Sequence, residues 1–199
     1  MSFRLGLGQP PQRLIRASDD GRWLAQVQQD RIAVHERRVD ERPSFSRVQP
    51  KLTEITKRVS DALGVAVLAA PHAPELVELT YANRVAAGVG WADFTQLDRV
   101  LRIVAPFPEG ASFDNAERTS VSMSSKLLEA EAFVGRLHIA AEPASDETGQ
   151  LHLQLGLISR RYIRGNDLGD TLDACHRDIV LGFTAATTGD MHKIWGRFR

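Results

Sequence analysis

The sequence predicts an α+β fold in which helices pack on one face of a mostly antiparallel sheet, with a long helix near the C-terminus. Three observations predict it. Leucines alternate with other residues over 151–158, as in a strand with one buried face. Apolar residues recur at helical spacing over 168–183. Tight polar turns between the predicted strands favour antiparallel pairing, with helices gathered on one side.

The first third of the chain reads as three strands followed by a helix. "RLIRASDDGRWLAQVQ" predicts strand, turn and strand, because residues 18–21 supply short polar side chains and a glycine for the turn. "RIAVHERR" predicts a third strand, and "VDERPSF" predicts a loop. We expect a helix from Gln49 to Leu63, with Pro50 in its first turn and Gly64 as its C-terminal stop.

The middle of the chain carries weaker patterns. We expect strands at "VAVLAA" (65–70) and "ELVELTYANRVA" (75–86), and a second, shorter helix over 91–104. "PFPEGASFDNAER" is the most loop-like stretch, and the pattern of "TSVSMSSKLLEAEAF" is ambiguous, so its secondary structure is left open.

A hairpin is the clearest prediction in the last third. "GRLHIAAEP" and "GQLHLQLGLISRR" would pair through a loop closed near Glu142 and Gln150. That register implies three facing pairs: Leu137 with Leu155, Ile139 with Leu153, and His138 with Gln154.

The long helix would follow the hairpin and cover its apolar face. Asn166 or Asp167 would cap its start, "TTGD" would end it, and "MHKIWGRF" would add a short turn carrying Trp195. The core prediction is that four leucines face three residues of the helix: Leu151, Leu153, Leu155 and Leu157 against Leu172, Ile179 and Phe183.

The length of the chain and the order of its predicted strands and helices indicate one α+β domain spanning 1–199. Strands followed by a helix recur near 12–64 and 120–186, so an internal duplication is a further hypothesis, although the two halves share no motif. Lys and Arg equal Asp and Glu, so the chain has no net charge. The overall charge therefore does not favour binding to nucleic-acid phosphates. It also means that little charge repulsion opposes association of the chain with a second copy or a partner.

The compartment is predicted from what the sequence lacks. Cys175 is the only cysteine, so no intrachain disulfide can form and a reducing compartment fits. The first residues lack the apolar run of a signal peptide, and no stretch approaches the roughly 18 apolar residues of a membrane span. We therefore expect a cytoplasmic protein that does not enter a membrane.

Candidate binding residues lie on the polar face of the predicted hairpin. Arg136, His138, His152 and Gln154 would share that face, which could line a polar groove or bind an anion. Residues of this kind more often simply solvate the outer face of a sheet. "RRYIRG" could stack bases between its arginines, but a solvated strand end fits better, and the acids of "ERRVDER" offset its arginines.

Asp173 and His176 are the second candidate pair. They would share a helix face, either as a functional pair or as two metal ligands, with Asp190 and His192 as further ligands. The structural alternative places His176 at the edge of the core, with Asp173 as a hydrogen-bond acceptor. Cys175 lies on the apolar stripe, where a buried thiol would be inert.

Motifs of the common enzyme classes are absent. The sequence holds no phosphate-binding glycine loop, no G-x-S-x-G nucleophile elbow and no H-E-x-x-H metal motif. An enzyme is therefore unsupported though not excluded, and we expect no catalytic residues, no metal site and no cofactor.

From about residue 14 onward the chain resembles a sporadically distributed family of bacterial and archaeal proteins with no assigned function. The matching stretches include "DGRWLAQVQQDRIAVHERR", "ELTYANRV", "GRLHIAAEP", "LHLQLGLISR" and "LDACHRDIVLGFTAATTGDMHKIWGR". The family usually carries an Asn-Trp pair where this chain has His35 and Glu36. It also carries an aromatic-proline segment, to which "ERPSF" is only loosely similar, and a longer N-terminal region. The resemblance implies no activity, and its scattered distribution is similar to that of mobile-element or defence genes.

Three functions follow as hypotheses. The leading one is a non-enzymatic binding or assembly module for a protein partner or a second copy of the chain. The second is a small-molecule binder with a cavity between the sheet and the C-terminal helix. The third is a metal-dependent enzyme using Asp173 and His176.

Overall fold

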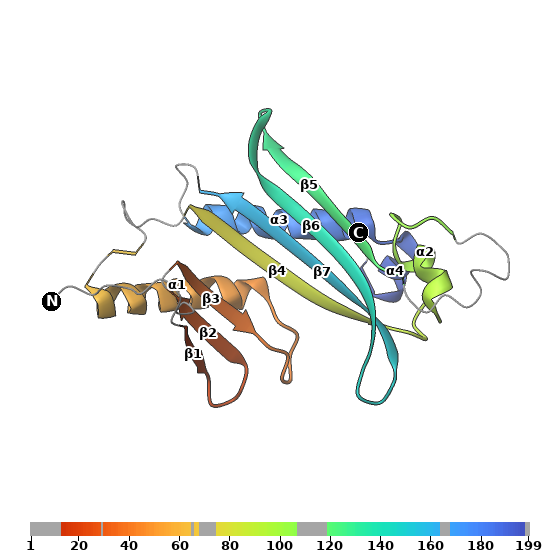
Figure 1. Cartoon of the computed structure of the whole chain (residues 1–199), viewed down its shortest axis with the longest axis horizontal. Helices are drawn as coiled ribbons and strands as arrows, with labels where there is room; N and C mark the ends of the chain where they lie inside the picture. Colours follow the sequence, from red (N-terminus) through yellow and green to blue (C-terminus); the bar gives the residue numbers. More distant parts are fainter. Residues whose placement is uncertain are drawn as a thin grey trace, which may run out of the picture. The chain divides into compact units, whose positions relative to one another are not determined.

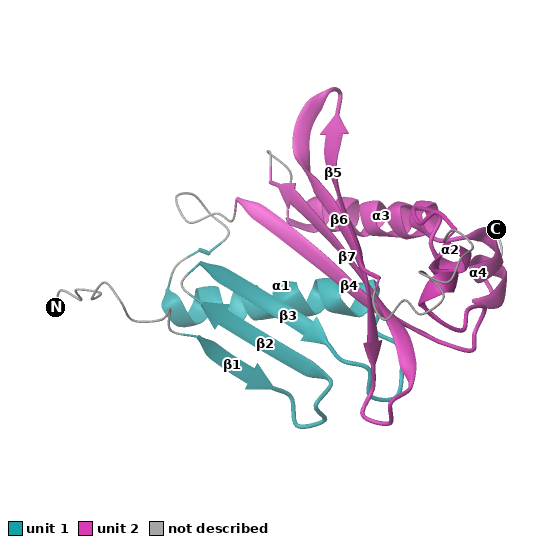
Figure 2. Cartoon of the chain, turned by 45° about the vertical axis from the view of Figure 1, so that its right-hand side comes forward, with its two compact units in different colours: residues 1–74 teal, residues 75–199 magenta. Residues whose placement is uncertain are grey.

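The computed structural model describes residues 13–28, 30–64, 66–67, 75–106, 119–163 and 168–197. Figure 1 shows two antiparallel sheets and helices, so the α+β class is confirmed. By their contacts, residues 1–74 and 75–199 form two separate units, coloured separately in Figure 2. In both units, strands precede a long helix. The single domain and the internal duplication stay predictions.

The first unit contains a three-stranded antiparallel sheet and one helix. Strands β1 (Leu14–Ala17), β2 (Trp23–Gln28) and β3 (Arg31–Glu36) pair in the order β1-β2-β3, as predicted. The predicted turn at 18–21 is present: Asp20 accepts a hydrogen bond from the Arg22 N–H, and Gly21 has a φ of 68°. Helix α1 (Phe45–Leu63) packs against β3.

Helix α1 begins at Phe45, so the predicted start at Gln49 is wrong and Pro50 lies inside the helix, not in its first turn. The reason is a contact with β3. The Ser44 N–H donates to Glu36 Oε2 at 2.8 Å, and the Ser44 carbonyl accepts from the N–H groups of Arg47 and Val48. This anchors the helix start ahead of the proline. The C-terminal stop is confirmed, because Gly64 is left-handed with a φ of 64°.

The second unit is a four-stranded antiparallel sheet with its strands in the order β4-β7-β6-β5. These are β4 (Leu76–Ala86), β5 (Val121–Glu129), β6 (Ala132–Ser145) and β7 (Leu151–Tyr162). Helix α3 (Leu168–Ala186) lies along one face of the sheet, against β7, β4 and β6 (Figure 1). We call the opposite face the α3-free face.

Short helices close one end of the second unit: η1 (Phe94–Gln96), α2 (Leu97–Val100) and α4 (Gly189–Ile194). The helix predicted over 91–104 is therefore too long. It ends because Leu101 bridges to Thr187, and the Arg102 N–H donates to the Ala186 carbonyl. The predicted break at "TTGD" and the final turn are confirmed, with Trp195 capping α4.

The core of the second unit follows the leucine alternation. Leu153, Leu155 and Leu157 are fully buried, together with Leu172 and Ile179 of α3. A Cβ placed on Gly182 would lie 2.5 Å from Leu137 Cδ2, so this part of α3 approaches β6 closely. The predicted faces of β6 and β7 are thus confirmed, although Leu151 and Phe183 are only half-buried and the Phe183 ring contacts Trp195.

The predicted hairpin register is wrong. Leu137 pairs with Ser159, Ile139 with Leu157, His138 with Ile158, and Glu142 with Gln154. Strand β6 continues past Glu142 to Ser145, and Asp146 closes the turn by accepting hydrogen bonds from the Thr148 and Gln150 N–H groups at 3.0 and 2.9 Å. The shift is even-numbered, so every side chain keeps its predicted face.

Several predictions fall outside the described residues. They include the helix N-cap at Asn166 or Asp167 and most of the "PFPEGASFDNAER" loop. Of the strand predicted at 65–70, only Ala66 and Val67 are described, and neither lies in a strand. In the described part of the chain, no helix combines the length and the apolar character needed to cross a membrane.

Candidate functional site

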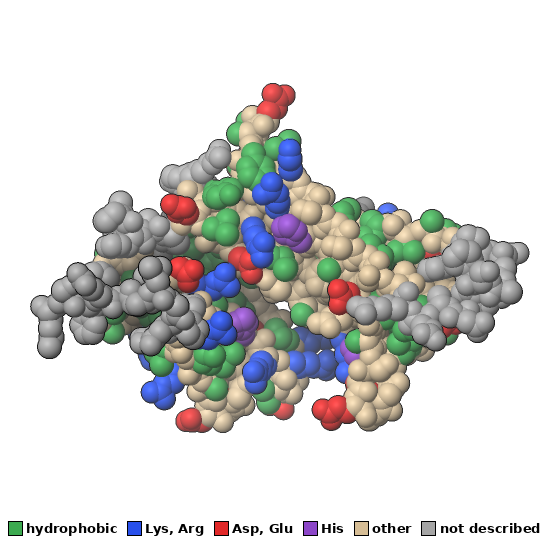
Figure 3. Space-filling view, viewed as in Figure 1, with side chains coloured by type: hydrophobic (Ala, Val, Ile, Leu, Met, Phe, Trp, Pro, Cys, Tyr) green, Lys and Arg blue, Asp and Glu red, His purple; other side chains and the backbone are tan. Residues whose placement is uncertain are grey.

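The α3-free face of the second unit brings together part of the predicted binding set. In β7, and in β6 from Leu137 to Ala141, the odd-numbered residues are the buried ones that face α3, so Arg136, His138, His152 and Gln154 share the opposite face. Arg136 and His138 line one groove on this face, whereas His152 and Gln154 lie farther along β7. Figure 3 shows Lys and Arg side chains gathered beside a histidine over this part of the sheet.

A row of cations crosses the sheet at the groove. Lys126 of β5 pairs in register with Arg136 of β6, which pairs with Arg160 of β7, which pairs with Glu78 of β4. Side chains directly opposite on neighbouring strands lie about 5 Å apart at Cβ. Arg160 forms an ion pair with Glu78. Within the described ranges, neither Lys126 nor Arg136 has an ion-pair partner. We call Lys126, Arg136 and Arg160 the cation row.

Aromatic rings form one wall of the groove. The rings of Phe133 and Tyr162 meet edge to face at 6.0 Å, and the Arg136 guanidinium lies 4.9 Å from the centre of the Phe133 ring. A Cβ on Gly135 would collide with the Arg160 carbonyl, so only glycine allows β6 to approach β7 here. The groove has a volume of about 450 Å³ and is lined by Leu76, Ser124, Phe133, Gly135, Arg136, His138, Arg160 and Tyr162.

The groove offers cationic and aromatic side chains. Guanidinium and ammonium groups pair with carboxylates or phosphates, and the rings offer apolar contact beside them. Ser124 pairs in register with His138, but no hydrogen bond joins their side chains in the described structure. Nucleophilic catalysis would require a base within hydrogen-bonding reach of the hydroxyl.

Asp173 and His176 lie on α3, away from the groove. His176 is half-buried, and its Nδ1 lies 2.9 Å from the Tyr81 hydroxyl of β4. Burial raises the pKa of Tyr81, so this hydroxyl stays protonated at neutral pH and can donate to the ring. Tyr81 is thus a partner for His176 that the sequence did not suggest. Asp173 is exposed.

The other proposed metal ligands lie beyond the far end of α3. Asp173 is near the start of that helix, while Asp190 and His192 belong to α4. A helix of that length separates the two pairs by about 20 Å. His192 Nε2 contacts Thr187 Oγ1 at 2.7 Å, and Asp190 pairs with Lys193. Among the residues that the structure describes, no three His, Cys, Asp or Glu side chains cluster to hold a metal ion.

A second hollow lies beside α2 and α4, with a volume of about 360 Å³, and Asp98, Arg99 and Asp190 are among its lining residues. Neither this hollow nor the groove lies between the sheet and α3.

No family model, curated protein or solved structure matches the chain. The resemblance to the sporadic bacterial and archaeal family therefore stays a prediction.

The sequence did not suggest a buried ion pair that joins β7 to α3. Arg161 is 12% exposed and binds the Asp178 carboxylate, which also accepts a hydrogen bond from Ser159 at 2.9 Å. The solvated strand end predicted for "RRYIRG" is therefore wrong at Arg161, although Arg160 and Tyr162 are exposed. Cys175 is fully buried, and burial raises the pKa of its thiol, which agrees with an inert cysteine.

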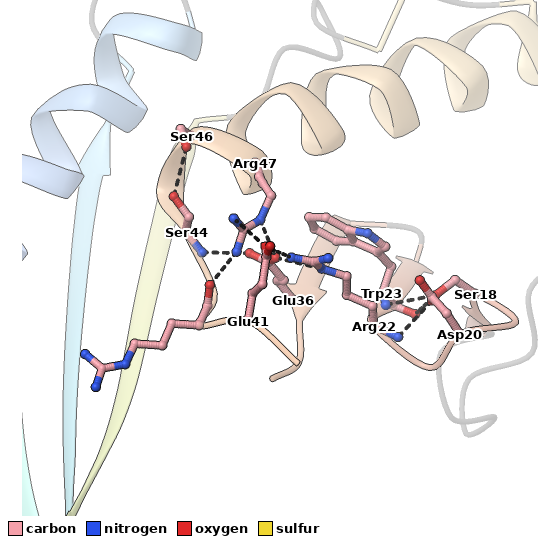
Figure 4. Close-up of polar contacts among 10 residues, drawn as sticks. Ser18, Asp20, Arg22, Trp23, Glu36, Glu41, Ser44, Ser46 and Arg47 are labelled. Carbon is pink, nitrogen blue, oxygen red and sulfur yellow. Dashed lines mark hydrogen bonds and ion pairs between the residues drawn. The ribbon is translucent and has the colours of Figure 1, made fainter. Parts of the chain in front are cut away.

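The first unit holds a second polar cluster, drawn in Figure 4. The Glu36 side chain is fully buried and accepts hydrogen bonds from Arg22 Nε at 3.1 Å and Arg47 Nε at 2.7 Å. Glu41 binds the same two arginines from the exposed side. Two acids of "ERRVDER", Glu36 and Glu41, thus pair with Arg22 and Arg47 rather than with the arginines of their own segment. The cluster joins β3 to the start of α1, which is a structural role.

Proposed function

We propose that the protein is a non-enzymatic binding module, and that it holds an acidic segment of a partner protein on the α3-free face of the sheet. The observation that carries the proposal is the cation row. Like charges directly opposite on neighbouring strands repel, and among the described residues only Arg160 of the cation row has an acid paired with it. The row therefore costs stability, and a carboxylate-bearing partner would offset that cost while gaining charge-assisted hydrogen bonds.

Charge distribution favours a protein over a nucleic acid as the partner. Residues 75–199 contain 13 Lys and Arg against 17 Asp and Glu, a formal charge of −4. Binding of a nucleic acid depends on neutralising many phosphates, and an overall acidic unit opposes the approach of such a polyanion. A short acidic segment needs only a local row of cations. A cytoplasmic location, inferred from the single cysteine, belongs to the same proposal.

The test is calorimetric titration of the full chain with a synthetic peptide in which Glu alternates with Val. Arg136→Ala should weaken binding about tenfold, because a hydrogen bond to a charged group contributes roughly 1.5–3 kcal/mol. Arg177→Ala is the matched control, since Arg177 is an exposed arginine on α3. Added salt should weaken binding by the intact chain.

Two results would overturn the proposal. The first is no binding of the Glu–Val peptide at low salt. The second is equal weakening by Arg136→Ala and Arg177→Ala, because binding would then depend on overall charge and not on the cation row.

A further inference from the structure

We infer that the acidic segment docks as an additional strand on the outer edge of β5. The inference rests on the proposed function and names its binding mode. In the described structure β5 pairs with β6 alone, so it forms one edge of the sheet. An edge strand presents unpaired N–H and C=O groups that can pair with an extended peptide.

The outer edge of β5 is regular over most of its length. Its register with β6 runs without interruption from Val121 to Leu127, and the only irregularity falls between Leu127 and Leu128. Proteins often protect such edges with a bulge, a proline or a lysine. Here the bulge lies at one end, which leaves Lys126 as the protecting residue of the regular part. A lysine repels cationic strands and accepts a strand that brings an acid beside it.

The two faces of β5 specify the chemistry of the incoming strand. On the α3-free face β5 carries Ser122, Ser124 and Lys126, and Lys126 ends the cation row. On the opposite face Val121, Met123 and Leu127 remain half-buried, because α3 packs mainly on β7, β4 and β6. A segment that matches this edge therefore alternates acidic and apolar residues. Its acids lie on the face of the cation row, and its apolar side chains lie beside Met123 and Leu127.

A second copy of β5 fits this edge poorly. An antiparallel pair of β5 strands centred on Ser125 would place Lys126 opposite Ser124, and centred on Lys126 it would place two lysines face to face. The only acid in β5 is Glu129, which already pairs with Arg161. A copy of the strand therefore brings no free carboxylate to the cation row.

The first experiment is amide hydrogen exchange by NMR on the full chain, with and without saturating Glu–Val peptide. In an edge strand, alternate amides point outward, so every second amide over 121–127 should gain protection when an extra strand pairs with β5. If Arg136→Ala weakens binding of the peptide but β5 amides keep their exchange rates, edge docking is wrong and the proposed function stands. If the peptide does not bind at all, the proposed function fails as well.

The second experiment is a charge exchange at Lys126. Lys126→Glu should lower affinity for the Glu–Val peptide about tenfold or more and raise affinity for a Lys–Val peptide of the same length. Arg177→Glu, which makes the same change on α3, should leave both affinities within about twofold. Equal effects of the two variants would overturn the inference, as would a dimer in sedimentation whose β5 amides are already protected from exchange without the peptide.

Discussion

Arg161 of β7 and Asp178 of α3 form a bidentate ion pair. Arg161 Nε donates to Oδ2 at 2.6 Å, and Nη2 donates to Oδ1 at 2.8 Å. The two side chains are only 12% and 11% exposed. The hydrogen bonds from Arg161 to Asp178 raise the pKa of the guanidinium, so Arg161 stays charged at all ordinary pH values. This contact ties the helix to the sheet at a defined position along β7.

Removing the acid from this pair should be costly. Asp178→Ala leaves Arg161 largely buried without its main counter-ion, so the free energy of unfolding should fall by about 3–5 kcal/mol. Urea denaturation of the full chain measures the change. Arg177→Ala, on the neighbouring exposed position of α3, should change stability by less than about 0.5 kcal/mol. A loss below about 1 kcal/mol for Asp178→Ala would mean that water replaces the carboxylate without penalty.

The buried face of β7 supports a second stability prediction. Leu155 is 0% exposed, so Leu155→Ala should remove packing and leave a cavity, lowering the free energy of unfolding by roughly 2–5 kcal/mol. Leu181→Ala is the control, because Leu181 on α3 is 62% exposed, and its loss should stay within about 0.5 kcal/mol. A loss below about 0.5 kcal/mol for Leu155→Ala in urea denaturation would mean that the two faces of β7 are assigned backwards.

The contrast between Leu155 and Asp178 shows which features of this fold the sequence can predict. The face of Leu155 depends only on alternation, which is a local property, and it survives any even shift in register. The register itself is set by the turn at Asp146, whose geometry is visible only once the strands meet. Asp178 is likewise one acid among several on α3, and nothing local marks it as the partner of Arg161.

The candidate site was predictable only in part for the same reason. Alternation placed Arg136 and His138 on one face, and the structure keeps them there. The cation row, however, joins Lys126, Arg136 and Arg160 from three strands. Its existence depends on the β4-β7-β6-β5 order and on the corrected register, which are long-range properties of the fold.

Glu36 predicts a pH dependence for the first unit. Burial opposes ionisation of Glu36, but hydrogen bonds from the Ser44 N–H, Arg47 and Arg22 outweigh burial and lower its pKa below the usual 4.5. A lowered folded-state pKa means that the stabilisation is fully present above about pH 4.5 and is lost as the pH falls through the folded-state value. Glu36→Gln should therefore destabilise the unit at neutral pH and flatten this acid-dependent loss.

Denaturation at a series of pH values measures the Glu36 effect, with the indole proton signal of Trp23 reporting on the first unit. Glu41→Gln is the control. Glu41 binds the same two arginines but is 67% exposed, so its replacement should leave the acid-dependent loss in place. An unchanged pH profile in Glu36→Gln would contradict the assignment of this loss to Glu36.

The last prediction concerns His176, which we expect to be structural. Its Nδ1 is held by the Tyr81 hydroxyl, so His176→Ala should lower the free energy of unfolding by about 1 kcal/mol. His176→Gln retains a hydrogen-bonding group and should lose less. Tyr81→Phe should cost a similar amount, and the double variant should cost less than the sum of the two, because both remove the same hydrogen bond.

Metal analysis of the purified chain decides between this role of His176 and a metal site. We expect no stoichiometric transition metal, because Asp173 and His176 lie in the first half of α3, whereas Asp190 and His192 belong to α4, beyond the end of α3. Additive losses in Tyr81→Phe and His176→Ala would contradict the hydrogen-bonding role. A bound metal whose occupancy falls when His176 or His192 is replaced would instead favour the metal-dependent enzyme, because only ligand residues control occupancy in that way.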